Sequence, residues 1–344
     1  MEFEFATLDV FTNRRLEGNP LAVVKVRDSQ KDKLTQDLKQ KIAKEFNLSE
    51  TTFLHVPDGD VGKSTAPSAL SVDIFTIESE LPFAGHPTIG TAVLAKSLFP
   101  SVSTLNIKAG PIGLDPYNVN GRAFIRAKIP HNVHLHARTL ADVIPAAQQA
   151  TYEGLSHGEP QIRERELAAP VFSVVCGMTF VLVKLPSLEL LGRVGRLRLD
   201  FDALPAPLLD VDSEWAPSFV ARYYYVDVDD NEGEGAKGAG KVGGEGKQHV
   251  RKIRTRMVEL GFEDPATGSA ASCLASYLTL TEGVQEEGGA GASFEIVQGV
   301  EMGRRSEIRV DTTTETDGKG RTKIKDVYLG GEAVVVQKGT ITVD

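Results

Sequence analysis

Apolar and polar residues alternate over positions 2–10, and a second strand-like segment occupies positions 21–26. A period of two is typical of β-strands that bury one face. Gly18-Asn19-Pro20, between the two segments, has the composition of a turn. The pattern therefore predicts that a hairpin opens the chain.

A helical period replaces this alternation between positions 34 and 46. The apolar residues that carry it are Leu34, Leu38, Ile42 and Phe46. Their spacing predicts an amphipathic helix that buries one stripe, and Asn47 is placed to end it in the left-handed conformation. Strands are predicted to follow at 51–56 and 70–77.

Two later segments, 87–99 and 265–280, are apolar or small on nearly every side. Such a composition is typical of a helix surrounded by protein, so a sheet must wrap around each of them. The strand-like segments of the second half include 171–175, 180–185 and 219–226. We therefore expect a mixed α and β protein.

The chain of 344 residues, 41% apolar and 25% charged, is too long for one simple core. Its 17 Pro and 33 Gly residues suit many short strands and turns. Pro130-His131-Asn132 resembles a crossing between halves, so we expect domains at 1–129 and 130–333. The sequence does not decide whether the last strand, 334–344, returns to the first half.

The charge of the chain bears on its partners. The net charge of -9 and the pI near 5.4 argue against nucleic acid, because a phosphate backbone selects basic surfaces. No apolar run approaches the roughly 20 residues of a membrane span, and the start of the chain does not resemble a signal peptide. With two cysteines there is no disulfide framework. We expect a cytoplasmic protein without nucleic-acid or membrane partners.

An internal repeat links the two halves. His86-Pro87-Thr88-Ile89-Gly90-Thr91-Ala92 and Asp264-Pro265-Ala266-Thr267-Gly268-Ser269-Ala270 both read [His/Asp]-Pro-x-x-Gly-[Thr/Ser]-Ala, and each precedes a small-residue helix. We expect Pro at the first helical position and the His or Asp at the cap. The halves are therefore interpreted as duplicated units.

Each repeat places small residues at a helix N-terminus, where unpaired N–H groups and a partial positive charge attract anions. Two such ends facing one cleft would hold a small carboxylate. The alternative is that Asp264 is only a good N-cap. His86 favours a site, because histidine is a poor cap and titrates near neutrality.

Three segments resemble the signature motifs of PhzF-like phenazine-biosynthesis proteins. They are Asn47-Leu48-Ser49-Glu50-Thr51-Thr52-Phe53, Phe83-Ala84-Gly85-His86-Pro87-Thr88-Ile89-Gly90 and Glu263-Asp264-Pro265-Ala266-Thr267-Gly268-Ser269-Ala270. Shorter matches occur at Asp9-Val10-Phe11-Thr12, Gly18-Asn19-Pro20-Leu21-Ala22-Val23, Gln298-Gly299 and Met302-Gly303-Arg304. The resemblance covers nearly the whole chain.

This resemblance implies the α+β fold of diaminopimelate epimerase. That fold has two pseudo-symmetric domains, each a curved, mostly antiparallel sheet or barrel around a central helix, with the site between them. It also implies a homodimer and a cofactor-independent isomerase. The two catalytic thiols of the epimerase are missing, because Ala84 and Pro265 stand at the corresponding positions. Cys176 and Cys273 lie outside both motifs, and we expect Cys273 in the core.

By resemblance, Glu50 is the general acid/base, and His86 and Asp264 complete the catalytic set. Substrate binding is assigned to Ser269, Gly85, Gly268 and Asn19. A carboxyl group shielded by a closing cleft has a raised pKa and can take and return a proton. The alternatives are that Glu50 is an ordinary polar residue at a helix-to-strand corner and that Ser269 bonds its own helix backbone.

Three functions remain open. The first is proton-transfer isomerisation of a small carboxylate-bearing metabolite, either anthranilate-like or amino-acid-like. The second is an amino-acid epimerase or racemase, which the missing thiols disfavour. The third is a non-catalytic small-molecule binding protein of the same fold. The sequence does not name the substrate.

Two other clusters, one of histidines and one of basic residues, are not interpreted as binding sites. His131, His134 and His136 have no carboxylate or Cys at ligand spacing beside them in the sequence, so we expect no metal ion. The basic run at 251–256 alternates across a predicted strand. We interpret it as a solvated strand or a set of salt bridges to an acidic surface, not as a nucleic-acid patch.

Positions 229–246 are dominated by Gly, Glu, Asp and Lys, a composition that predicts a disordered surface insertion. Because longer loops cost little additional entropy, deleting this segment should leave the melting temperature nearly unchanged. Thermal denaturation of the deletion variant checks this. A drop of more than about 5 °C, on the order of 1 to 2 kcal/mol, would show that the segment is packed.

Overall fold

The structure is a computed structural model that describes the chain except residues 60–66, 120, 211–213, 229–249, 260 and 283–290. The predicted insertion at 229–246 lies outside the described residues. The chain divides into two compact units. Unit 1 contains Met1–Pro130, Gly303–Ile308 and Tyr328–Asp344, and unit 2 contains His131–Met302 and Arg309–Val327.

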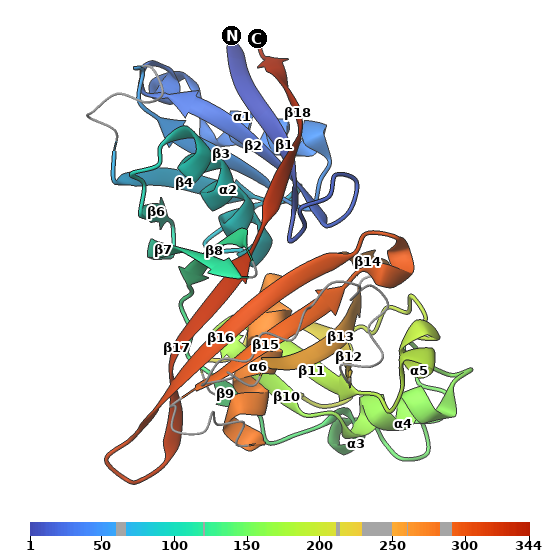
Figure 1. Cartoon of the computed structure of the whole chain (residues 1–344). Coiled ribbons are helices and arrows are strands. Elements are labelled where there is room, and N and C mark those ends of the chain that lie inside the picture. Colours follow the sequence, from blue (N-terminus) through green and yellow to red (C-terminus); the bar gives the residue numbers. More distant parts are fainter. Residues whose placement is uncertain (60–66, 120, 211–213, 229–249, 260, 283–290) are drawn as a thin grey trace. The chain divides into compact units, whose positions relative to one another are not determined.

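The strands of unit 1 follow one another across a sheet in the order β18, β1, β2, β3, β4, β6, β7, β8 (Figure 1). Their bounds are β1 (Glu2–Val10), β2 (Asn19–Arg27), β3 (Thr51–Val56), β4 (Ala69–Phe75), β6 (Thr104–Ile107), β7 (Gly110–Val119), β8 (Arg122–Lys128) and β18 (Ala333–Thr342). The pairs β2–β3 and β4–β6 are parallel and the others antiparallel. The short β5 (Glu80–Leu81) pairs with β4. The hairpin predicted at the start of the chain is confirmed as β1–β2.

Helix α2 (Gly85–Leu98) is the core of unit 1 and contacts β1, β2, β3, β8 and β18. Its small residues let the sheet approach closely. A Cβ added at Gly90 would come within 2.6 Å of side-chain atoms of both Val10 and Leu21, so only glycine fits there. The helix predicted at 87–99 is confirmed, together with its burial.

Helix α1 (Gln36–Phe46) packs on the outside of the same sheet, after the 3-10 helix η1 (Asp28–Lys33). The Thr35 hydroxyl caps it by accepting a hydrogen bond from the Leu38 backbone N–H. Its last cap is Asn47, with φ 49° and ψ 35°, which confirms the predicted left-handed ending. After the turn at Asn47 the chain reaches Glu50, and β3 begins at the next residue.

Unit 2 repeats the strand connections of unit 1. Its strands are β9 (His134–Leu135), β10 (Val171–Val175), β11 (Met178–Lys184), β12 (Phe219–Asp227), β13 (Val250–Glu259), β14 (Phe262–Asp264) and β15 (Gly291–Gln298). The long strands β16 (Ser306–Thr316) and β17 (Thr322–Gly331) belong to unit 2 from residue 309 to residue 327, and their other residues belong to unit 1. The series β10, β11, β12, β13, β15 has the same parallel and antiparallel steps as β1, β2, β3, β4, β6. The short strand β14 pairs with β13 as β5 pairs with β4. The duplication inferred from the repeated motif is confirmed by this topology.

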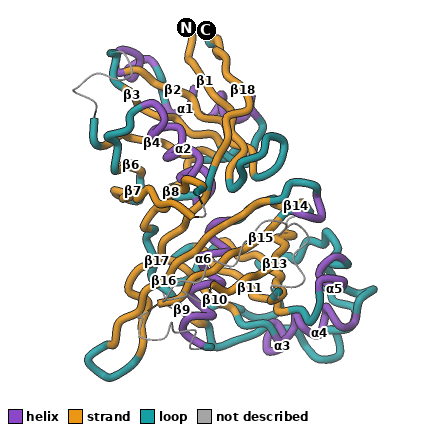
Figure 2. Tube along the Cα trace, in the orientation of Figure 1, coloured by secondary structure: helices purple, strands orange, loops and turns teal. Residues whose placement is uncertain are grey.

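Helix α6 (Gly268–Thr281) takes the place of α2 in unit 2 and contacts β10, β11 and β15 (Figure 2). Cys273 is fully buried in it, and its thiol donates a hydrogen bond of 3.2 Å to the Phe172 carbonyl oxygen. Burial raises the pKa of this thiol well above its usual value. The expectation that Cys273 is a core residue is confirmed.

Three short helices cover the other face of the unit 2 sheet: α3 (Leu140–Val143), α4 (Pro160–Ala168) and α5 (Leu188–Gly192). Val171, Val181 and Val183 pack in one apolar cluster with these helices. Phe172, which follows Val171 in β10, packs against Tyr277 of α6 instead, because successive side chains of a strand point to opposite faces of the sheet. A further 3-10 helix, η2 (Val300–Met302), follows β15.

None of the helices among the described residues has the length and hydropathy to cross a membrane. The basic run on β13 is engaged in ion pairs, as one of its two interpretations predicted. Arg251 pairs with Asp227 and Glu282, Arg254 with Glu301, and Arg256 with Glu263. Arg256 is buried, and its guanidinium also donates to the Leu191 and Val194 carbonyl oxygens at the end of α5.

A second buried guanidinium, Arg222 of β12, holds the sheet of unit 2 to its outer loops. Arg222 Nε lies 3.1 Å from Glu259 Oε2, and its Nη1 lies 3.0 Å from Glu166 Oε1. The remaining donors reach the Gly154 and Leu197 carbonyl oxygens, each at 2.7 Å. All three charged side chains are at most 1% exposed. Breaking such a pair leaves an uncompensated charge in the core.

We predict that Arg222→Met lowers the free energy of unfolding by about 3 to 5 kcal/mol, because it strands two buried carboxylates. Urea denaturation of the variant and the wild type measures the difference. Lys41→Met is the control, since Lys41 and its partner Asp37 are 70% and 76% exposed, and it should cost less than about 0.5 kcal/mol. A loss below about 1 kcal/mol for Arg222→Met would contradict the prediction.

Candidate active site

Glu50 lies at the corner between α1 and β3, where Asn47 turns the chain. Its side chain is 16% exposed, and its Oε2 atom is buried without a hydrogen-bond partner among the described residues. Burial raises the pKa of the carboxyl above its usual 4.5, and a hydrogen bond with Ser49 opposes the shift. A shielded carboxyl of this kind is suited to taking and returning a proton.

His86 brings an imidazole to this carboxyl from the first turn of α2. Its Nε2 lies 3.6 Å from Glu50 Oε2, and its side chain is 6% exposed. On the other side of the ring, the Asn19 amide nitrogen lies 3.5 Å from Nδ1. In the tautomer in which Nδ1 accepts from this amide N–H, the ring proton is on Nε2 and faces Glu50. The structure thus groups Glu50, His86 and Asn19.

The predicted position of His86 at the helix cap is wrong. The N-cap of α2 is Ala84, the helix begins at Gly85, and His86 and Pro87 lie within the first turn. The Thr88 hydroxyl and backbone N–H both donate to the Ala84 carbonyl oxygen. Proline is tolerated there because the first four N–H groups of a helix have no intrahelical acceptor.

The cap predicted for Asp264 is also wrong. Asp264 ends β14, paired with Met257, and α6 begins later, at Gly268, with Thr267 as its N-cap. The Asp264 carboxylate instead accepts a hydrogen bond of 2.6 Å from the Thr267 hydroxyl. This hydrogen bond stabilises the loop before α6 and does not cap the first turn of the helix.

Gln298, at the end of β15, explains this late helix start. Its amide nitrogen donates to the Asp264 carbonyl oxygen at 2.8 Å and to the Thr267 hydroxyl at 3.0 Å. Its Oε1 accepts from the Thr267 backbone N–H at 3.2 Å and from the Tyr223 hydroxyl at 3.0 Å. Gln298 therefore keeps the loop extended. Sequence reasoning matched Gln298-Gly299 to the family and gave it no role.

The proposed substrate-binding residues stand at the two helix starts. Gly85 and Gly268 are the first residues of α2 and α6, both buried, and the half-buried Ser269 follows Gly268. Neither N-cap residue makes a side-chain capping hydrogen bond. Glycine at this position lets a ligand approach the backbone N–H groups. That Asp264, Gly268 and Ser269 serve the same substrate as Glu50 and His86 stays a prediction.

Comparison with known proteins identifies the family of the chain. The family model for phenazine biosynthesis-like proteins, PhzC-PhzF, matches residues 8–208 and 244–339. An uncharacterised isomerase of Mesorhizobium japonicum is 33% identical, over 97% of this chain and 96% of its own length. The trans-2,3-dihydro-3-hydroxyanthranilate isomerase of Pseudomonas chlororaphis is 28% identical, over 98% of each chain.

Solved structures share the fold. A PhzF-family protein of Bacillus anthracis superposes with a TM-score of 0.66 at 20% identity, over 100% of both chains. A probable proline racemase of Agrobacterium radiobacter has a TM-score of 0.53 at 15% identity, over 99% of this chain and 93% of its own. Together with the family match and the full-length relatives, these findings show that the chain belongs to the phenazine biosynthesis-like (PhzC-PhzF) family and is an isomerase.

Proposed function

We propose that this isomerase shifts a proton within a small carboxylate-bearing metabolite, anthranilate-like or amino-acid-like, and that Glu50 is the general acid/base. The observation that carries the proposal is the buried Glu50 carboxyl, whose raised pKa accompanies an Oε2 atom with no hydrogen bond from the described residues. Structural carboxylates in the core, such as Glu259, are held by hydrogen bonds. An unsatisfied buried acid is a candidate for chemistry.

A single carboxyl group can perform both proton transfers of an isomerisation. As a carboxylate, Glu50 accepts a proton from one carbon of the substrate, and as the acid it returns the proton at another position. His86 presents its Nε2 to the same oxygen at 3.6 Å, a separation that can tighten to a hydrogen bond when substrate binds. Asn19 is a positioning residue that orients the imidazole.

The proposed substrate class is supported by the relatives and by the two helix starts. Named relatives act on trans-2,3-dihydro-3-hydroxyanthranilate, a carboxylate-bearing compound. Helix N-termini with glycine at the first position attract such a group. Asp264, Gly268 and Ser269 are proposed substrate contacts on the same grounds.

Racemisation by two thiols is a weaker alternative despite the fold shared with a probable proline racemase. Ala84 is the N-cap of α2 and Pro265 precedes α6, so neither helix start carries a thiol. The buried Cys273 donates its proton to a backbone carbonyl inside the core. Solvent deuterium incorporation into a panel of anthranilate-like and amino-acid-like acids tests the whole proposal, and no exchange on any of them would favour a non-catalytic binding protein.

Glu50→Gln should lower the deuterium exchange rate on an accepted substrate by about 100-fold or more, since the amide keeps the shape of the carboxyl and cannot carry the proton. Substrate binding, measured by calorimetry, should remain. Glu45→Gln is the matched control, because Glu45 is an exposed carboxyl in the last turn of α1. Wild-type exchange in Glu50→Gln would exclude Glu50 as the proton carrier and make His86 the candidate.

The raised pKa of Glu50 also predicts a pH-dependent stability difference. Between the unfolded and folded pKa values the native state binds more protons at this site, so the contribution of Glu50 is favourable at low pH and is lost as pH rises through the folded pKa. Glu50→Gln cannot ionise. Melting temperatures measured between about pH 4 and pH 8 should therefore show the wild type losing stability relative to Glu50→Gln as pH rises. A constant difference, or one of opposite sign, would contradict the raised pKa.

A further inference from the structure

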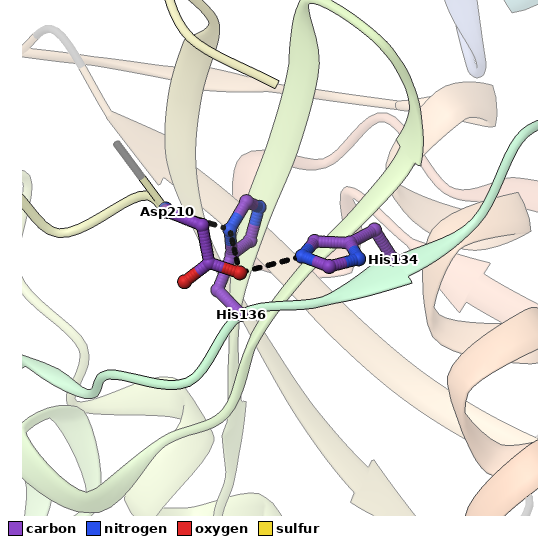
Figure 3. A group of neighbouring side chains, drawn as sticks. All are labelled: His134, His136 and Asp210. Carbon is purple, nitrogen blue, oxygen red and sulfur yellow. Dashed lines mark hydrogen bonds and ion pairs between the residues drawn. The ribbon is translucent and has the colours of Figure 1, made fainter. Parts of the chain in front are cut away.

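A compact group of ligating side chains lies in unit 2, outside the residues assigned to catalysis (Figure 3). His134 belongs to β9, His136 follows that strand, and Asp210 comes from the segment that leads toward β12. Their ligand atoms all lie within 4.8 Å of one another. We propose that His134, His136 and Asp210 bind a divalent transition-metal ion, with Zn²⁺ the ion of matching chemistry.

The Asp210 carboxylate lies close to both histidines. Its Oδ2 lies 2.7 Å from His134 Nε2 and 3.8 Å from His136 Nδ1. Ligand atoms at about 2.0 to 2.2 Å from a tetrahedral Zn²⁺ stand about 3.3 Å apart, which is between these two separations. The remaining separation, between His134 Nε2 and His136 Nδ1, is at most 4.8 Å. An ion that binds here replaces the proton of the hydrogen bond between His134 Nε2 and Asp210.

His136 is held in the orientation that a ligand needs. Its side chain has no solvent exposure, and its Nε2 lies 2.8 Å from the Ser173 hydroxyl. Ser173 in turn bonds Thr179, and Thr179 bonds Ser218, at 2.6 and 2.8 Å. A metal-binding histidine usually donates a hydrogen bond from its second ring N–H to an outer partner of this kind.

Aromatic contacts fix the other histidine. The His134 ring stacks on the buried Trp215, with ring centroids 4.9 Å apart and an interplanar angle of 11°. It also meets His136 edge to face at 4.8 Å. The second oxygen of Asp210 accepts a 3.3 Å hydrogen bond from the Ala137 backbone N–H. All three ligands are therefore positioned before an ion arrives, which lowers the entropic cost of binding.

The choice of ion follows from the donors. Two imidazole nitrogens and one carboxylate suit Zn²⁺, whereas Mg²⁺ and Ca²⁺ select oxygen ligands. Binding must displace the 3.2 Å hydrogen bond from the Asp210 backbone N–H to His136 Nδ1 and the proton between His134 and Asp210. Both costs weaken the affinity. The bound ion would tie β9 to the segment that contains Asp210.

The test is calorimetric titration of metal-free full-length protein with Zn²⁺ at pH 7.5. We expect one ion per chain with a Kd of about 1 to 10 μM, weakened at least about tenfold in His134→Ala and in Asp210→Asn. Both positions are about one-third exposed, so these variants should fold. His157→Ala and Cys176→Ser are matched controls at an exposed histidine and the exposed cysteine, and both should bind as the wild type does. Mg²⁺ should not bind.

Co²⁺ supplies a readout on the wild type alone. Absorption bands of a four- or five-coordinate ion should appear on titration and disappear when Zn²⁺ is added in excess. Absence of Zn²⁺ binding at about 100 μM would overturn the proposal, and so would binding that neither His134→Ala nor Asp210→Asn weakens, which would be adventitious. Retained exchange activity in both variants would show that this site is separate from the proposed function of Glu50.

Discussion

Close packing of a sheet around one small-residue helix is the constraint on which the rest of each unit depends. Val10 and Leu21 lie so near α2 that no side chain fits at Gly90. A helix enclosed in this way must begin at the edge of its sheet, and it carries the residues of its first turn there. In unit 1 this places His86 beside Glu50, which lies immediately before strand β3. The site geometry is therefore a consequence of core packing.

The buried side chains of Arg222 and Glu50 have different surroundings. Arg222 is surrounded by carboxylates and carbonyl oxygens that satisfy its donors, and it ties the outer loops of unit 2 to β12. Glu50 is almost as enclosed, yet its Oε2 lies 3.6 Å from the His86 imidazole and has no hydrogen bond from any residue in the described part of the chain. The first arrangement stabilises one structure, and the second raises the pKa of an acid that remains available.

The same fold is found in a PhzF-family phenazine biosynthesis protein and in a probable proline racemase. The fold by itself therefore does not decide the reaction. In this chain neither helix start carries a thiol, because the N-caps of α2 and α6 are Ala84 and Thr267. The proposed proton carrier is the carboxyl group of Glu50.

Local pattern in the sequence determined the elements that depend on nearby residues. The hairpin β1–β2, the amphipathic helix α1 with its left-handed end at Asn47 and the two enclosed helices follow from periodicity and composition. The repeated motif also indicated the duplication, and the signature motifs indicated the family. Only the tertiary structure decided where α6 begins, because Gln298 reaches Thr267 from a distant strand. It likewise decided that Asp210 joins His134 and His136, a contact that no spacing along the chain encodes, since it arises from the pairing and packing of segments far apart in sequence.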